Sequence, residues 1–183
     1  MNKFYAGFFL FLCSVFSYSQ SESVALGFGG KFAVPAAGFN DYAKNGFEAD
    51  GTILVAVARQ VGIELAIGYG KFVLKNSPEK SSIEEISVLP GIRYFADTDN
   101  IIPYVSLNFG LQNNKVKLKS ESDSTASLIN NQFSEKNNFA VQCGVGILTR
   151  LSSDFSFDLS INYRAVRKSS FLSANAKIFL NIY

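Results

Sequence analysis

Apolar and polar residues alternate strictly along the segment 154–164, "DFSFDLSINYR". A period of two is typical of a β-strand with one apolar and one polar face. The pattern therefore predicts a strand here and leaves open which face points inward. The apolar parity holds Phe155, Phe157, Leu159, Ile161 and Tyr163.

The same alternation recurs along the rest of the chain and gives eight runs of about ten residues, enough for a tilted strand to cross a hydrocarbon layer. The connections between runs alternate in length, so the longer ones all fall at one end of an up-and-down meander. This plan predicts an all-β fold, an eight-stranded antiparallel up-and-down transmembrane β-barrel. The runs are 24–34, 47–57, 63–73, 86–94, 103–111, 139–147, 155–163 and 172–182; the short connections are 59–61, 96–100 and 151–154; the longer ones are 35–45, 75–81, 113–137 and 165–170.

Pro90 lies inside the fourth run and cannot donate a ladder hydrogen bond. With Gly91 beside it, we expect a β-bulge at this point.

The polar parity of these runs consists mostly of Gly, Ala, Ser, Asn and Thr, with one or two charges per run. A soluble surface usually carries about a quarter or more charged residues. Small side chains suit the narrow interior of eight strands. The polar face is therefore expected inside and the apolar face outside, toward lipid. The alternative is a secreted soluble lipocalin-like barrel, which turns the apolar face inward around an apolar ligand.

The charged residues of the polar parity support the same orientation. When neighbouring runs are paired across their connections, each charge faces one of opposite sign, as buried charges require and exposed ones do not. Such interior ion pairs would fix the register and close the lumen. The expected pairs are Glu64 with Arg93, Asp158 with Lys177, and Lys31 with both Glu48 and Asp50.

Aromatic residues of the apolar parity lie near the ends of the runs, where the aromatic girdles of membrane barrels sit. They are Tyr69, Tyr94, Phe139, Phe155 and Tyr163.

Residues 1–20 have the plan of a secretory signal peptide. Lys3 precedes an apolar stretch, 4–16, which is followed by the small polar residues "SYSQS". The stretch is shorter than the roughly 20 residues of a spanning helix. We therefore expect an exported protein whose mature domain, 21–183, is the barrel. Removal of the signal takes Cys13 with it and leaves Cys143 without an internal disulfide partner.

The eight runs, the ending "SYSQS" and the aromatic last residue resemble the small outer-membrane β-barrel proteins of Bacteroidetes, of the OmpA/OmpX type. The resemblance implies a bacterial outer-membrane location with both termini in the periplasm. It also implies a C-terminal assembly signal whose final aromatic faces lipid. Tyr183 departs from this pattern, because Leu180 and Ile182 occupy the lipid parity instead.

Composition argues against several activities. The chain has 17 basic and 15 acidic residues, a formal net charge of +2 and no basic patch for nucleic acid. Small barrel enzymes of this kind generally use a histidine base, and the chain has no His. A Ser–Lys pair or carboxylates alone are alternative bases, but no such constellation stands out in the sequence. The sequence contains no cluster of Cys or His that would indicate a metal site, and we expect no cofactor. Glu84 and Glu85 are interpreted as a strand-end charge pair. We expect a non-enzymatic monomer, whose narrow, ion-paired lumen does not conduct.

The longest connection, 113–137, is the expected interaction surface, for an unidentified protein or for lipid. Its first residues continue the alternation, so Lys115, Lys117 and Lys119 share the outward parity. Such lysines could contact anionic head groups of outer-membrane lipid, including lipopolysaccharide; a solvated hairpin tip is the alternative. The predicted role is structural or interactive through long extracellular loops, with an accessory role in a secretion or uptake assembly as a further alternative.

Overall fold

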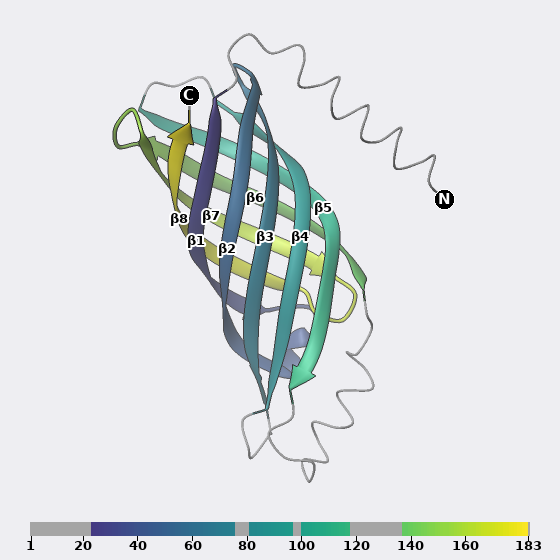
Figure 1. Cartoon of the computed structure of the whole chain (residues 1–183). Coiled ribbons are helices and arrows are strands. Elements are labelled where there is room, and N and C mark those ends of the chain that lie inside the picture. The colour runs from purple at the N-terminus through teal and green to yellow at the C-terminus, as the bar shows by residue number, and fades with distance from the viewer. Residues whose placement is uncertain (1–22, 76–80, 97–99, 118–136, 183) are drawn as a thin grey trace, which may run out of the picture.

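The computed structural model describes residues 23–75, 81–96, 100–117 and 137–182, and within them eight strands form one closed antiparallel barrel (Figure 1). Each strand pairs with the next along the chain, and β1 also pairs with β8 to close the sheet. The predicted fold class is therefore confirmed. The strands are β1 Val24–Pro35, β2 Ala43–Ala58, β3 Val61–Leu74, β4 Ser82–Phe95, β5 Ile101–Lys117, β6 Asn138–Arg150, β7 Phe155–Val166 and β8 Phe171–Ile182. A 3₁₀ turn, η1 (Phe39–Asp41), lies between β1 and β2.

The two ends of the barrel differ in their connections. The β2–β3 and β6–β7 turns lie at the end where β1 begins and β8 ends, and η1 lies at the opposite end (Figure 1). We call these the turn end and the loop end. The connection 165–170 was predicted to be one of the longer ones. Because β7 continues to Val166, only residues 167–170 join β7 to β8, as few as the 151–154 turn between β6 and β7. The hydroxyl of Ser170 accepts from the Val166 amide at 3.1 Å and donates to its carbonyl at 3.0 Å, which closes this tight turn.

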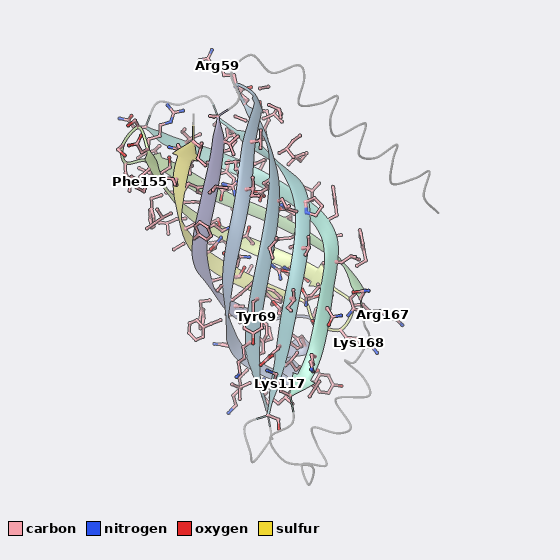
Figure 2. All side chains as sticks on the ribbon, in the orientation of Figure 1. Arg59, Tyr69, Lys117, Phe155, Arg167 and Lys168 are labelled. Carbon is pink, nitrogen blue, oxygen red and sulfur yellow. The ribbon has the colours of Figure 1, made fainter. Side chains whose placement is uncertain are left out.

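The alternation in the sequence becomes an apolar outer surface and a polar interior. On β7, Leu159 and Ile161 are exposed on the outer face, while Asp158 and Arg164 are buried in the lumen. All five predicted girdle aromatics also lie on the outer face and are exposed. The orientation expected from the sequence is therefore the one observed. Figure 2 shows Tyr69 and Phe155 toward opposite ends of the barrel.

Pro90 does not introduce the predicted bulge. The β3–β4 register runs through Leu65 and Pro90 without a shift, and the β4–β5 register is the same on both sides of it. Only the pairs between β5 and residues 89–90 are missing from the ladder. The strand tolerates Pro90 because its ring lies on the exposed outer face and the neighbouring pairs hold the register.

Both ends of the lumen are apolar, which the alternation in the sequence did not predict. At the loop end, Phe72 contacts Phe39 of η1 and Phe171 of β8, with ring centroids 5.1 and 5.3 Å apart. At the turn end, Phe179 and Leu54 are buried on the inward parity. The inward parity therefore changes from apolar to polar and back to apolar along the barrel axis, and the buried charges lie between the two apolar layers.

Candidate functional sites

Arg164 of β7 lies at the centre of the first ionic layer of the lumen. Its guanidinium donates to Glu48 Oε1 at 3.0 Å, to Glu85 Oε1 at 3.3 Å and to Gln142 Oε1 at 3.0 Å. The side chain is only 1 % exposed, so these partners replace water around the charge. Glu48 and Glu85 come from β2 and β4, so one residue of β7 joins strands that are far apart in the sheet.

Further ion pairs extend this layer across the barrel. Lys31 Nζ lies 2.9 Å from Glu48 Oε1 and 3.6 Å from Asp50 Oδ2. Asp50 Oδ2 in turn lies 2.5 Å from Lys177 Nζ, which also donates to the Thr52 hydroxyl at 2.8 Å. We define the Arg164 layer as the six charges that alternate in sign along this path. They are Glu85, Arg164, Glu48, Lys31, Asp50 and Lys177.

A second layer lies toward the turn end and is organised by Arg93 of β4. Its guanidinium donates to Glu64 Oε2 at 2.7 and 3.1 Å and to Asp158 Oδ2 at 2.6 Å. The Tyr104 hydroxyl donates to Asp158 at 2.7–2.9 Å, and the Asn108 amide donates to Glu64 Oε1 at 2.8 Å. We define these five residues as the Arg93 layer. It contains two carboxylates and one cation.

The expected ion pairs are brought together to different extents. Lys31 contacts both Glu48 and Asp50, as the sequence suggested. Glu64 contacts Arg93, although the backbone register pairs Glu64 with Gly91 and the long arginine side chain spans the difference.

The expected pair of Asp158 and Lys177 requires a correction. Their Cα atoms are directly paired between β7 and β8, but the two side chains bind different partners. Asp158 binds Arg93, and Lys177 binds Asp50, because side chains in a narrow lumen reach across it as easily as along the sheet.

Glu84 and Glu85 do not form a strand-end charge pair. Consecutive residues of a strand point to opposite faces, so Glu85 enters the lumen and binds Arg164, whereas Glu84 lies on the outer face. There Glu84 Oε2 lies 2.9 Å from Lys117 Nζ, whose side chain is largely exposed.

A row of charged residues crosses the outer face near the loop end. Antiparallel pairing places Lys71 of β3 opposite Glu84, and Glu84 opposite Lys115 of β5. Lys117 reaches the same glutamate, and the Tyr69 hydroxyl hydrogen-bonds it from β3. Figure 2 shows Tyr69 and Lys117 toward the loop end of the barrel and Arg59 at the turn end.

We call Lys71, Glu84, Lys115 and Lys117 the lysine row. Lys115 and Lys117 were predicted from the sequence, whereas Lys71 was not and is added by the β3–β4 pairing. Lys119, most of the connection 113–137, the signal segment 1–20 and Tyr183 lie outside the described residues.

Other site types are limited in the described part of the chain. No group of His, Cys, Asp and Glu there could hold a metal ion. None of the helices described there is long and apolar enough to span a membrane. Cys143 is a free thiol on the outer face of β6.

No protein-family model matches the sequence, and no curated protein matches it. Solved structures do resemble this one. Neisserial surface protein A has a TM-score of 0.60 at 15 % identity, over 88 % of this chain and 97 % of that one. OprG of Pseudomonas aeruginosa has a TM-score of 0.60 at 10 % identity, over 90 % and 97 %. Ail of Yersinia pestis, solved with the heparin analogue sucrose octasulfate, has a TM-score of 0.57 at 11 % identity, over 89 % and 100 %. The chain therefore has the eight-stranded fold of small outer-membrane barrels.

Proposed function

We propose that this protein is a non-enzymatic barrel of the bacterial outer membrane, with a structural or surface-interaction role at its loop end. The observation that carries the proposal is the inverted distribution of residues. Phe28 and Phe47 are each 70 % exposed on the outer face, whereas nine charged side chains of the two layers are buried inside. A soluble protein rarely exposes so continuous an apolar surface, and acyl chains would cover it in a membrane.

A soluble carrier of an apolar ligand would need the opposite arrangement. Its cavity would be lined by apolar side chains and be large enough for the ligand. Here the middle of the lumen is filled by the Arg164 and Arg93 layers, and Gln112 and Asn108 are fully buried among them. The structure therefore argues against the carrier alternative, and the same filling supports a barrel that does not conduct.

The absence of histidine from the sequence and the pairing of the buried carboxylates support a non-enzymatic role. The sequence has no histidine, and the buried carboxylates of both layers are engaged by Arg or Lys side chains. The signal peptide, the Bacteroidetes origin and a part in a secretion or uptake assembly remain predictions from the sequence. Mass determination of the mature protein from its native host would test the signal peptide, with cleavage expected near residue 20.

Fractionation and gel mobility test the location. We expect the full-length protein, expressed with its own N-terminus in a Gram-negative host, to fractionate with outer membranes and to need detergent for extraction. Unheated samples should migrate differently from boiled ones, because a barrel resists unfolding by cold detergent. Recovery in the soluble periplasmic fraction, with the same mobility before and after boiling, would overturn the proposal.

Contact with anionic head groups is proposed for Lys115 and Lys117 at the loop end, together with Lys119 of the connection. In the described part, Lys115 extends from the outer face and Lys117 is paired with Glu84. A Lys→Gln substitution at all three positions should reduce association with lipopolysaccharide without changing gel mobility. Unchanged association would leave the solvated hairpin tip as the better interpretation.

A further inference from the structure

A shallow hollow of about 640 Å³ lies on the apolar outer face, mainly over β8, β1 and β2. Small residues leave the backbone uncovered here. Phe32 and Phe47 stand on the side toward the loop end, and Tyr69 stands at the β3 edge. The outward-facing residues that form it include Gly30, Ala49, Ala174, Ala176, Phe47 and Tyr69. Pairing places Ala49 between Gly30 and Tyr69, so the hollow begins beside Tyr69 and runs across β2 to β1.

Gly30 is not required by the packing of the barrel. A Cβ at the neighbouring Gly29 would strike the Ala176 backbone and the Lys177 side chain, so that inward glycine is sterically necessary. A Cβ at Gly30 would meet nothing nearer than a backbone oxygen at 3.9 Å, and the register on both sides of it is regular. Glycine inside a strand costs stability and often marks the close approach of a ligand.

The lysine row begins beside this hollow, at Lys71 on β3, and extends away from it across β4 to β5. Lys71 follows Tyr69 by two residues on the same face of β3, and Phe47 is paired with Lys71. The row contains three lysines and one glutamate, so it carries a net positive charge at the edge of the apolar surface. Cationic side chains and a tyrosine at this height suit the boundary between head groups and hydrocarbon.

We propose that the hollow and the lysine row together bind one phosphorylated, multi-acyl glycolipid of the outer leaflet. A phosphate of the head group lies against Lys71 and Lys115, and one acyl chain lies in the hollow beside Phe47 and Tyr69. This inference rests on the proposed outer-membrane location. It adds Lys71 to the head-group contacts suggested by the sequence and adds the hollow as a site for an acyl chain. Together they form a binding site for one lipid molecule.

Charge distinguishes this occupant from a second copy of the chain. Two barrels in one membrane would share an orientation and place their lysine rows at the same height, so like charges would approach each other. An anionic glycolipid instead matches both the charge of the row and the apolar hollow beside it.

Native mass spectrometry of the full-length, detergent-solubilised protein tests the site. The probes are bis-phosphorylated hexa-acyl lipid A and phosphatidylglycerol, each added in titration. We expect one lipid A to bind and Gly30→Leu to reduce its affinity at least fivefold, because the new side chain fills the hollow. The matched control is Gly51→Leu, an outward glycine with similar free space that does not line the hollow. Both variants must show the wild-type mobility shift on unheated gels, which confirms a folded barrel.

The lysines are tested separately. Lys71→Gln with Lys115→Gln should weaken lipid A binding about tenfold, while Arg150→Gln at the turn end should leave it unchanged. Equal binding of phosphatidylglycerol, equal binding by the Gly30→Leu variant, or a dimer that excludes lipid would each overturn the inference. The proposed outer-membrane location would survive these results, since it depends on fractionation and not on lipid selectivity.

Discussion

The two ionic layers of the lumen differ in how many cations share the buried carboxylates. In the Arg164 layer, three cations alternate with three carboxylates, and Glu48 has both Lys31 and Arg164 as partners. In the Arg93 layer, one guanidinium serves both Glu64 and Asp158. The first layer therefore distributes its charge compensation over several strands. The second depends on a single residue.

Neighbouring rings also differ between the layers. The Arg93 guanidinium lies 4.0 Å from the Tyr104 ring centroid and 5.7 Å from that of Phe179. Arg164 faces the Phe171 ring at 4.8 Å. Cation–π contacts of this kind are worth more where water is excluded, so aromatic rings partly make up for the smaller number of ionic partners around Arg93. We therefore expect removal of a cation to lower the free energy of unfolding by different amounts in the two layers.

The largest effect is expected from Arg93→Met. Methionine keeps much of the apolar stem but leaves two buried carboxylates in a layer without a cation, and breaking a buried pair in this way costs about 3–5 kcal/mol. The measurement is urea unfolding in lipid vesicles, followed by the gel mobility of the folded form because the chain has no tryptophan. If Arg93→Met lowers the free energy of unfolding by less than Arg164→Met does, the Arg93 layer does not depend on its single cation.

Arg164→Met should cost less, about 2–3 kcal/mol, because its carboxylates keep other partners. Glu48 retains Lys31 at 2.9 Å, and Glu85 retains the Gln112 amide at 2.8 Å. The same unfolding experiment applies, with exposed Arg150→Gln as the control for loss of one positive charge. Equal losses for Arg164→Met and Arg93→Met would mean that the number of cations in a layer does not matter.

From the sequence, it was possible to predict the strands, their two faces and ion pairs between neighbouring strands. Strict alternation predicted the strands and the two faces, and pairing of consecutive runs across their connection placed Lys31 near Glu48. The partners of Arg164 could not be found in this way. Glu48 and Glu85 belong to β2 and β4, which are not neighbours of β7, and they meet only because the sheet closes.

Two other features lay outside simple alternation. Phe72, Phe171 and Phe179 occupy the inward parity, where the periodicity led us to expect small or polar side chains. The sequence signal for these apolar layers was the presence of phenylalanine at inward positions near the ends of the strands. Lys71 continues the outward parity of its run, but its place in the lysine row depends on the β3–β4 register. Register is determined by the whole sheet and is not visible in one run.

Neutralising one carboxylate in each layer sharpens the comparison further. Asp158→Asn removes a negative charge from a layer that has more carboxylates than cations, and the amide oxygen can still accept from Arg93. We expect a loss of about 1 kcal/mol. Glu48→Gln removes the shared partner of two cations and should cost about 2 kcal/mol. The reverse order, measured by the same urea midpoints, would show that hydrogen-bond geometry outweighs charge balance.

The smallest effect is expected on the outer face, where Lys117 pairs with Glu84. The distance is 2.9 Å, similar to that between Lys31 and Glu48, but the Lys117 side chain is 56 % exposed. Exposed pairs gain little because water and salt screen them and both long side chains must be ordered. Lys117→Gln should therefore leave the urea midpoint unchanged, whereas Lys31→Gln should lower it clearly because Glu48 and Asp50 are buried. A similar shift for the two variants would imply that the outer face near the loop end is excluded from water, and the lysine row would then have to be placed deeper in the membrane.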